Sequence, residues 1–288
     1  MDIAMNDTIC MVTGATSGMG KATAAALAQM GATVVLVARN AAKGEVVRDE
    51  IRAQSGNARV EVLVADLSSR VAIHTLAETF KQQYQQLHVL VNNAGGIFFQ
   101  RETTVDEMEM SLAVNHLAPF LLTSLLLDVL KASGSARIIN ISSSVERVGT
   151  LTFADLQRTQ HYIGFTAYAQ AKLALLLATY ECARRLEGTG VLVNAVTPGP
   201  VATNFGKQNR VLSFLFGFAT SAEHGAQTAI YLASAPEMKG ITGKAFYHKQ
   251  MRRSSRASYD LALQQRLWHV SEELTGMTFT APASVLQT

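Results

Sequence analysis

The strongest constraint on the fold of this chain is a regular alternation of two patterns. Short apolar runs rich in β-branched residues predict strands at 8–13, 33–38, 59–65, 88–92, 137–142, 192–196 and 244–248. Amphipathic windows between them predict helices at 19–30, 41–54, 69–84, 104–131, 167–187, 222–234 and 259–275. Most of the strand runs are apolar almost throughout, which is typical of parallel strands covered by helices on both faces. The alternation therefore predicts a doubly wound α/β sheet.

The fold class expected from this pattern is a single-domain Rossmann fold, with a parallel sheet of about seven strands flanked by helices on both faces. No repeat, linker or low-complexity stretch divides the chain. We expect residues 1–250 to form the dinucleotide-binding and catalytic part, and residues 251–288 to form a C-terminal helical extension of the same domain.

Composition excludes several classes of function. The formal net charge of +3 is too small to indicate a nucleic-acid partner. The two cysteines lie inside apolar segments and support neither a disulfide nor a metal site. The N-terminus has no signal-peptide pattern, and the longest apolar stretch, residues 117–130, is too short to cross a bilayer. We therefore expect a cytoplasmic protein with no metal site and no transmembrane segment.

A glycine cluster follows the first strand directly, in the sequence TGATSGMG at 13–20. Glycines permit positive φ and close approach of the backbone, and a helix N-terminus offers free N–H groups to a pyrophosphate. A tight strand-to-helix turn needs glycines too, but the position between the first strand and the first helix favours a dinucleotide. The candidate residues are Gly14, Ser17, Gly18 and Gly20.

Arg39, at the end of the second strand, indicates which dinucleotide is bound. A carboxylate there would bind the ribose hydroxyls of NAD, but positions 38 and 40 are not acidic. The guanidinium group matches a phosphate in a bidentate manner, so NADP(H) is favoured, with Lys21 as a second cation. The alternative is a solvated arginine at a strand end.

The third and fourth strands end in further candidates. Asp66 either accepts a hydrogen bond from an adenine amino group or caps the helix that begins near Ser69. The sequence NNAG at 92–95 suits a tight turn whose small residues let the backbone approach a ligand, so Asn92 and Gly95 join the cofactor set.

Later segments add polar residues at the same edge of the sheet. Asn115 lies inside an apolar helix, and Pro119 cannot donate the bond that the carbonyl of Asn115 would normally accept, which predicts a local kink. Ser142, Ser143 and Ser144 lie at the end of the fifth strand, where ligands bind in such folds; the alternative is that they form a turn and a helix cap. The sixth strand leads into a rigid turn, followed by the hydroxyl of Thr203.

Tyr168 and Lys172 lie one helical turn apart on the same helix face. A phenol with a pKa near 10 is a poor acid or base at neutral pH. An ammonium about 4 Å away, at an effective dielectric constant of about 20, stabilises the phenolate by up to roughly 4 kcal/mol, or about three pKa units. The pair therefore predicts a tyrosine tuned towards proton transfer at neutral pH.

Taken in order, GxxxGxG, NNAG, a serine on strand five, YxxxK and PGPVAT resemble the classical short-chain dehydrogenase/reductase family. The resemblance covers roughly residues 8–250. The stretches ARNAAKGE, VNHLAPFLLT and RLWHVSEELTG are similar to its retinol-dehydrogenase-like branch. That branch implies an NADP(H)-dependent oxidoreductase that interconverts an apolar aldehyde or ketone and its alcohol.

The resemblance also implies roles for particular residues. The catalytic set falls on Asn115, Ser143, Tyr168 and Lys172, with Ser142 as the alternative to Ser143. The tyrosine acts as general acid and base, Ser143 holds the substrate oxygen, and Lys172 also binds the nicotinamide ribose. The cofactor set falls on Gly14, Ser17, Gly18, Gly20, Arg39, Asp66, Asn92, Gly95, Tyr168, Lys172 and Thr203.

Two features set this chain apart from that branch. Many members carry an N-terminal membrane segment, which this sequence lacks, so retinoid specificity is not assumed. An apolar cluster within residues 211–218 is a lid over an apolar substrate, a peripheral membrane contact or plain core packing. The apolar helices at 104–131 and 167–187 are candidates for pairing in a homodimer or homotetramer.

Two other functions fit the same motifs. A protein that senses NADP(H) or acts as a scaffold on this fold would not need the intact serine, tyrosine and lysine. A reductase of steroids or other ketones would use the same machinery on a different substrate. Turnover of NADPH with a panel of carbonyl compounds separates the three hypotheses.

Overall fold

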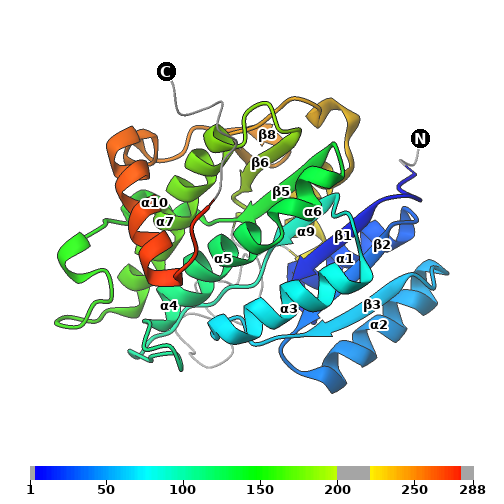
Figure 1. Ribbon diagram of the computed structural model, residues 1–288, viewed down its shortest axis with the longest axis horizontal. Coiled ribbons are helices and arrows are strands. Elements are labelled where there is room, and N and C mark those ends of the chain that lie inside the picture. Colours follow the sequence, from blue (N-terminus) through cyan, green and yellow to red (C-terminus); the bar gives the residue numbers. More distant parts are fainter. Residues whose placement is uncertain (1–3, 200–220, 280–288) are drawn as a thin grey trace.

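The computed structural model describes residues 4–199 and 221–279 of the 288-residue chain. Thr203 and the apolar cluster at 211–218 lie outside the described residues. The described part forms one α/β domain in which helices cover both faces of a central sheet (Figure 1). The predicted single-domain Rossmann fold is therefore confirmed.

The central sheet has eight strands within the described residues, in the order β3-β2-β1-β4-β5-β6-β7-β8. The first seven pair in parallel, as the apolar runs predicted, and β8 pairs antiparallel with β7 at the edge. The strands are β1 (Ile9–Thr13), β2 (Thr33–Ala38), β3 (Val60–Val64), β4 (Val89–Asn92), β5 (Ala136–Ile141), β6 (Val191–Val196), β7 (Lys244–Tyr247) and β8 (Gln250–Met251).

The helices pack in two layers, one on each face of the sheet. One layer holds α1 (Gly18–Gln29), α2 (Ala41–Ser55) and α9 (Ala222–Ser234). The other holds α3 (Arg70–Gln83), α4 (Met110–Leu112), the π-helix η1 (Ala113–Leu117), α5 (Ala118–Leu125), α6 (Leu127–Ala132) and α7 (Gly164–Arg185). Short 3₁₀ turns are η2 (Ser144–Val148), η3 (Phe153–Asp155), η5 (Pro236–Met238) and η6 (Arg256–Tyr259).

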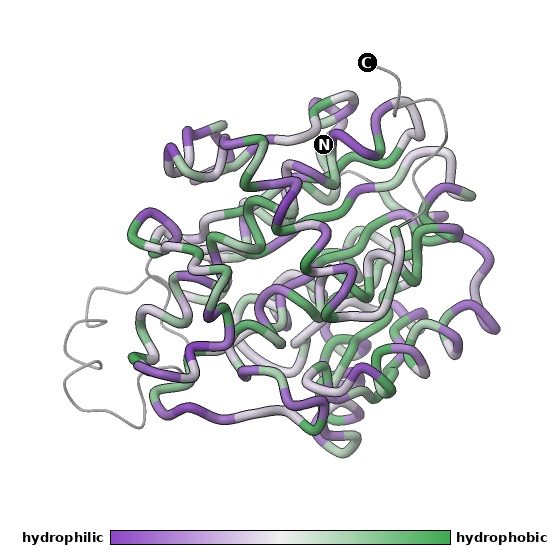
Figure 2. Tube along the Cα trace, turned by 60° about the vertical axis from the view of Figure 1, so that its left-hand side comes forward, coloured by the Kyte–Doolittle hydropathy of each residue, from purple (hydrophilic) through white to green (hydrophobic). Residues whose placement is uncertain are grey.

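The hydrophobic core divides into two large clusters, one under each helix layer. Alternate residues of a strand face opposite clusters, as Met11 and Val12 of β1 do. Figure 2 shows the hydrophobic residues concentrated along the central strands and the hydrophilic ones along the outer loops and helices.

The C-terminal helix α10 (Leu261–Thr275) packs along α7 on the outside of the second layer (Figure 1). Trp268 anchors it, because the indole ring is 1% exposed and contacts the rings of Phe120 and Phe279 at 4.9 Å between centroids. Trp268 and Phe279 are therefore part of one of the two large core clusters.

The helix predicted over 104–131 is interrupted. Residues 104–109 form a turn in which the Thr104 hydroxyl accepts hydrogen bonds from the N–H groups of Asp106 and Met108, both at 3.2 Å. The helix begins at Met110, takes π geometry over Ala113–Leu117 and is broken again at Leu126. The irregularity predicted around Asn115 is present, but the start and the length of the helix were predicted wrongly.

Candidate active site

The order of the strands brings the glycine turn and the loop after β4 together. The chain winds outwards from β1 towards β3 on one side and from β4 towards β8 on the other, so β1 and β4 flank a topological switch point. Thr13 joins the two segments, because its hydroxyl oxygen accepts hydrogen bonds from the N–H groups of Asn93 (3.0 Å) and Ala94 (2.9 Å). Such switch points are the usual ligand sites of this fold class.

The glycine turn packs tightly against the β4 loop. Gly14 and Gly18 have positive φ values of +63° and +56°. A Cβ atom on Gly20 would lie 2.4 Å from both the carbonyl oxygen of Gly14 and Nδ2 of Asn93, so no larger residue fits. Ser17 is the N-cap of α1, and its side chain makes no capping hydrogen bond. This arrangement is a backbone cradle at a helix N-terminus, as a pyrophosphate requires.

The candidates at the ends of β2 and β3 are exposed. Arg39 follows β2 directly, and Lys21 pairs with Glu50 of α2. Asp66 accepts hydrogen bonds from the N–H (2.9 Å) and the hydroxyl (2.8 Å) of Ser68. The cap of α3 is Ser69, whose hydroxyl accepts from an N–H of the first turn, so the alternative that Asp66 caps this helix is wrong.

Asn92 lies inside the protein and is 2% exposed. Its Nδ2 donates to Oδ1 of Asn140 on β5 (2.8 Å) and to the hydroxyl of Thr123 (3.3 Å). The next residue, Asn93, lies nearer to the glycine turn, and its Nδ2 donates to the carbonyl oxygen of Thr13 at 2.9 Å. Sequence reasoning did not single out Thr13 and Asn93, although each lies within a motif that it recognised.

Tyr168 and Lys172 lie on the first turns of α7, facing the carboxyl end of β5. Nζ of Lys172 donates to the carbonyl oxygen of Ile141 at 2.8 Å and lies 5.6 Å from the centre of the Tyr168 ring. Lys172 is 4% exposed, whereas Tyr168 is half-buried at the edge of the site. The pair therefore shares one face of the helix, as the four-residue spacing predicted.

Burial controls the pKa values of this pair. It raises the pKa of the Tyr168 phenol to about 12, against a smaller lowering by the neighbouring Ser143 side chain, and it lowers the pKa of Lys172 to about 7. The expectation that Lys172 lowers the pKa of Tyr168 is wrong for the protein alone, because desolvation raises the pKa of the phenol and only the Ser143 side chain opposes that rise. The phenol is therefore protonated at neutral pH.

The serines at the end of β5 separate into two environments. Ser143 is partly exposed, caps η2 and lies close enough to Tyr168 to affect its pKa. Ser142 is 3% exposed, and its hydroxyl has no hydrogen-bond partner among the described residues. The geometry thus brings Ser143, rather than Ser142, to the phenol.

Asn115 lies in the π-helix and completes the constellation. Its Oδ1 accepts from the N–H of Gly96 (3.1 Å), and its Nδ2 donates to the carbonyl oxygens of Gly96 (2.8 Å) and Ser111 (2.9 Å). A Cβ atom on Gly95 would lie 2.6 Å from Oδ1 of Asn115 and 3.3 Å from Nζ of Lys172. The β4 loop, the π-helix and α7 therefore meet at Gly95.

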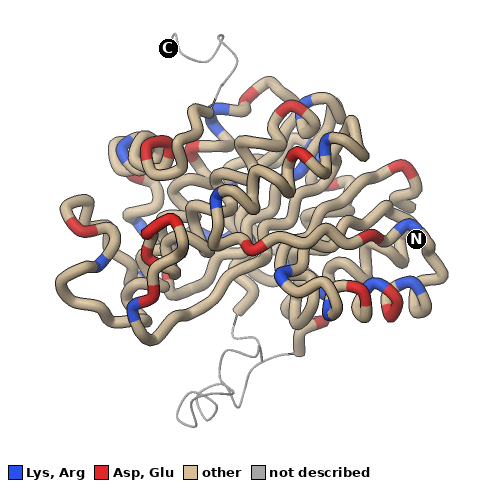
Figure 3. Tube along the Cα trace, turned by 60° about the horizontal axis from the view of Figure 1, so that its bottom comes forward, with Lys and Arg blue, Asp and Glu red and all other residues tan. Residues whose placement is uncertain are grey.

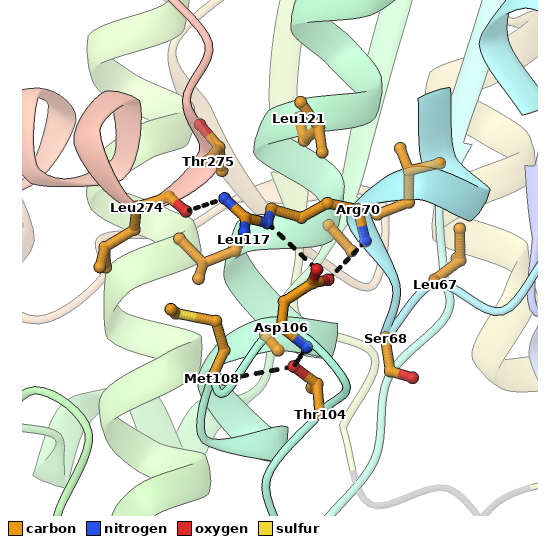
Figure 4. A pocket seen from close by; sticks show the side chains of 13 residues that line it. Leu67, Ser68, Arg70, Thr104, Asp106, Met108, Leu117, Leu121, Leu274 and Thr275 are labelled. Atoms are coloured by element: carbon orange, nitrogen blue, oxygen red, sulfur yellow. Dashed lines mark hydrogen bonds and ion pairs between the residues drawn. The ribbon is translucent and has the colours of Figure 1, made fainter. Parts of the chain in front are cut away.

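A cavity of about 20 Å³ lies away from these residues, between the start of α3, the turn at 104–108 and the end of α10 (Figure 4). Arg70 crosses it, with its backbone N–H bound to Oδ2 of Asp106 (2.7 Å) and its guanidinium bound to the carbonyl oxygen of Leu274 (3.3 Å). The volume suits one water molecule, so we assign the cavity no substrate.

The surface shows acidic and basic residues interspersed along the outer helices (Figure 3). Among the helices of residues 4–199 and 221–279, none combines the length and the apolar character that a membrane crossing requires.

Comparison with known proteins identifies the family. The short chain dehydrogenase family matches residues 8–211. The chain belongs to this family. Retinol dehydrogenase 12 of Mus musculus is 42% identical over 274 residues, covering 93% of this chain and 86% of the relative. Polyprenol dehydrogenase of Homo sapiens is 39% identical over 283 residues, covering 94% and 86%. The resemblance to the retinol-dehydrogenase-like branch is thereby confirmed, and the protein is an oxidoreductase of this family.

Solved structures agree with this assignment. An uncharacterized protein from Mycobacterium paratuberculosis superposes with a TM-score of 0.81 at 30% identity, covering 97% of each chain. The Pseudomonas aeruginosa RhlG/NADP active-site complex superposes with a TM-score of 0.70 at 25% identity, covering 85% of this chain and 95% of that chain. The family uses a nicotinamide cofactor, and the second structure contains NADP.

Proposed function

We propose that this dehydrogenase interconverts an apolar aldehyde or ketone and its alcohol with NADP(H), using Tyr168 as general acid and base. The observation that carries the proposal is the meeting of Ser143, Tyr168 and Lys172 at the carboxyl end of β5, beside the switch point. A phenol, a hydroxyl and an ammonium close together can stabilise the negative charge that develops on the substrate oxygen.

The glycine turn fits the cofactor. The close approach at Gly20 and the free N–H groups at the start of α1 would hold the pyrophosphate. Arg39 would contact the 2′-phosphate, because it is exposed at the end of β2, the strand next to β1. We also assign contacts to Asp66, Asn92, Gly95 and Thr203, as the family motifs imply. When bound, the nicotinamide supplies or accepts the hydride.

The residues of the chain then handle the proton. Tyr168, protonated at neutral pH, donates its hydroxyl proton to the substrate oxygen as negative charge develops there during reduction. Ser143 donates a hydrogen bond to the same oxygen and orients it. When Lys172 is protonated, its ammonium group adds a positive charge to the site. Because its pKa is near 7, the group can gain and lose this proton at neutral pH. The side chain of Asn115 positions the β4 loop, and its backbone carbonyl would anchor a water that leads from Lys172 to solvent.

The apolar character of the substrate rests on the relatives. Retinol and polyprenol, the substrates in the names of these relatives, are long apolar alcohols. The apolar cluster at 211–218 of this sequence is a second reason to expect an apolar substrate. We further propose a cytoplasmic location and a homodimer or homotetramer. For the cluster at 211–218 the alternatives are a lid over the substrate, a peripheral membrane contact and core packing.

The experiment is NADPH oxidation, followed by absorbance, with linear aldehydes from three to ten carbons and a steroid ketone. We expect kcat/KM to rise along the aldehyde series by up to roughly 0.8 kcal/mol per buried methylene. A flat series would contradict the apolar pocket. Preference for the steroid would favour the ketone-reductase alternative. NADPH binding without any turnover would favour a sensor or scaffold.

A further inference from the structure

A buried carboxylate lies at the start of the helix that carries Asn115. Glu109 is 0% exposed and is the N-cap of α4, which continues into η1 and α5. Its Oε1 accepts from the N–H of Ser111 and its Oε2 from the N–H of Leu112, both at 2.7 Å. A carboxylate that accepts the free N–H groups of a helix start fixes that end of the helix firmly.

The hydroxyl group of Tyr162 connects this carboxylate to the rest of the site. It lies 2.8 Å from the carbonyl oxygen of Phe98, 3.1 Å from Oε1 of Glu109 and 3.4 Å from the hydroxyl of Ser111. Tyr162 lies two residues before Gly164, the first residue of α7, and Phe98 lies in the loop that follows β4 and contains Gly95. One hydroxyl therefore joins the loop that carries Gly95, the start of the helix that carries Asn115, and the segment that leads into α7 with Tyr168 and Lys172.

Backbone packing supports the same connection. The first residue of α7 is Gly164, and a Cβ atom there would lie 2.3 Å from the carbonyl oxygen of Phe98 and 2.7 Å from Cα of Phe99. The N–H of Glu109 donates to Oε1 of Gln157 at 2.7 Å, which ties the helix start to the segment before α7. The loop therefore also meets α7 through backbone packing, and the start of the Asn115 helix is bound a second time to the segment before α7.

We propose that Tyr162 and Glu109 are positioning residues that hold the 95–98 loop, Asn115 and Tyr168 in their relative places. The inference rests on the proposed function, because these segments matter together only if they form an active site. Tyr162 and Glu109 act through the segments that they join. Small displacements of reacting groups are costly, since a shift of about 1 Å can reduce a rate by about a hundredfold.

The test compares Tyr162→Phe with Tyr180→Phe. Tyr180 lies on α7, is 7% exposed and places its hydroxyl 2.7 Å from that of Ser254, so each variant loses one hydrogen-bonded tyrosine hydroxyl. We expect kcat/KM for an aldehyde to fall by about tenfold to a hundredfold in Tyr162→Phe and to change by less than about threefold in Tyr180→Phe. Glu109→Gln keeps the shape but places an amide NH2 group against one of the two helix N–H groups, so its kcat/KM should fall at least as far as that of Tyr162→Phe.

Hydrogen exchange of the free protein, followed by mass spectrometry, gives a readout that does not need turnover. Residues 95–100 and 110–117 should exchange faster in Tyr162→Phe and at the wild-type rate in Tyr180→Phe. Unchanged exchange in both segments, or a kcat/KM of Tyr162→Phe within about twofold of wild type, would overturn the proposal. If wild-type protein reduces no carbonyl compound, the proposed function fails, and the exchange comparison still decides whether the junction holds the segments.

Discussion

Replacing Lys172 by methionine should stabilise the protein without cofactor, although it removes a proposed catalytic group. The side chain is 4% exposed, and burial lowers its pKa from 10.5 to about 7. Because each pKa unit corresponds to about 1.4 kcal/mol, the charged form loses up to about 5 kcal/mol on folding. Removing the ammonium also leaves the carbonyl of Ile141 without its donor, at a cost of about 1–3 kcal/mol. We expect Lys172→Met to be about 2–4 kcal/mol more stable than wild type at pH 6.

The pH dependence of this difference has a definite sign. Below about pH 7 the lysine is protonated in both states, so wild type carries the whole cost of burying the charge. Between about pH 7 and 10.5 only the unfolded chain holds the proton, so the stability of wild type rises with pH. The advantage of Lys172→Met should therefore shrink by up to about 1.4 kcal/mol per pH unit above pH 7.

Urea unfolding at about pH 6 and pH 9, with circular dichroism as the signal, measures both stabilities. Subtracting wild type from the variant cancels the other titrating groups. Lys43→Met, at an exposed position on α2, is the control and should show no comparable gain. The reasoning is refuted if Lys172→Met is no more stable than wild type at pH 6, or if the difference is the same at both pH values.

Three further changes test other parts of the structure. Arg39→Asp should reverse the preference for NADPH, which we expect to exceed tenfold in kcat/KM, or about 1.4 kcal/mol; equal use of NADPH and NADH by wild type would contradict the role of Arg39. Gly20→Ala should weaken NADPH binding at least about tenfold, because its Cβ would lie 2.4 Å from Gly14 and Asn93; fluorescence titration with unchanged affinity would argue against the cradle. Trp268→Ala should lower the free energy of unfolding by about 3–5 kcal/mol, measured in urea; a loss below about 1 kcal/mol would show that α10 is not anchored there.

The sheet could be predicted because its strands are buried on both faces. Such strands leave continuous apolar runs, and all seven runs that we identified correspond to β1 to β7. The edge strand β8 left no such signal, since it has only two residues and both are exposed. The turn before it uses His248 and Lys249 at positive φ (48° and 62°), where glycine or asparagine would have indicated a turn.

The helix around Asn115 was only partly predictable. Pro119 indicated the irregularity, because it cannot donate the backbone bond that a regular helix needs. The true start depends on a carboxylate, Glu109, that binds the first N–H groups, and on the turn closed by Thr104. An amphipathic pattern continuing through residues 104–131 concealed that start.

The motifs predicted which residues form the candidate site, but they did not predict the pKa values of those residues. The spacing of Tyr168 and Lys172 fixed their common helix face, and the strand order explains why Ser143 and Gly95 lie near them. The sign of the pKa shift at Tyr168 depends on burial, which a sequence does not report, so the expected lowering was wrong. The connection through Tyr162 and Phe98 links residues 64 positions apart and left no local pattern.

The most direct test of the account is the rate of carbonyl reduction by Tyr168→Phe with NADPH bound. The substitution keeps the ring and deletes the hydroxyl that donates the proton, so the fold and the NADPH affinity should be retained. We predict that kcat falls by roughly 10²–10⁴ relative to wild type, the range typical of general acid–base catalysis. Near-normal turnover by Tyr168→Phe, with NADPH binding intact, would contradict the proposed role of Tyr168 and the mechanism built on it.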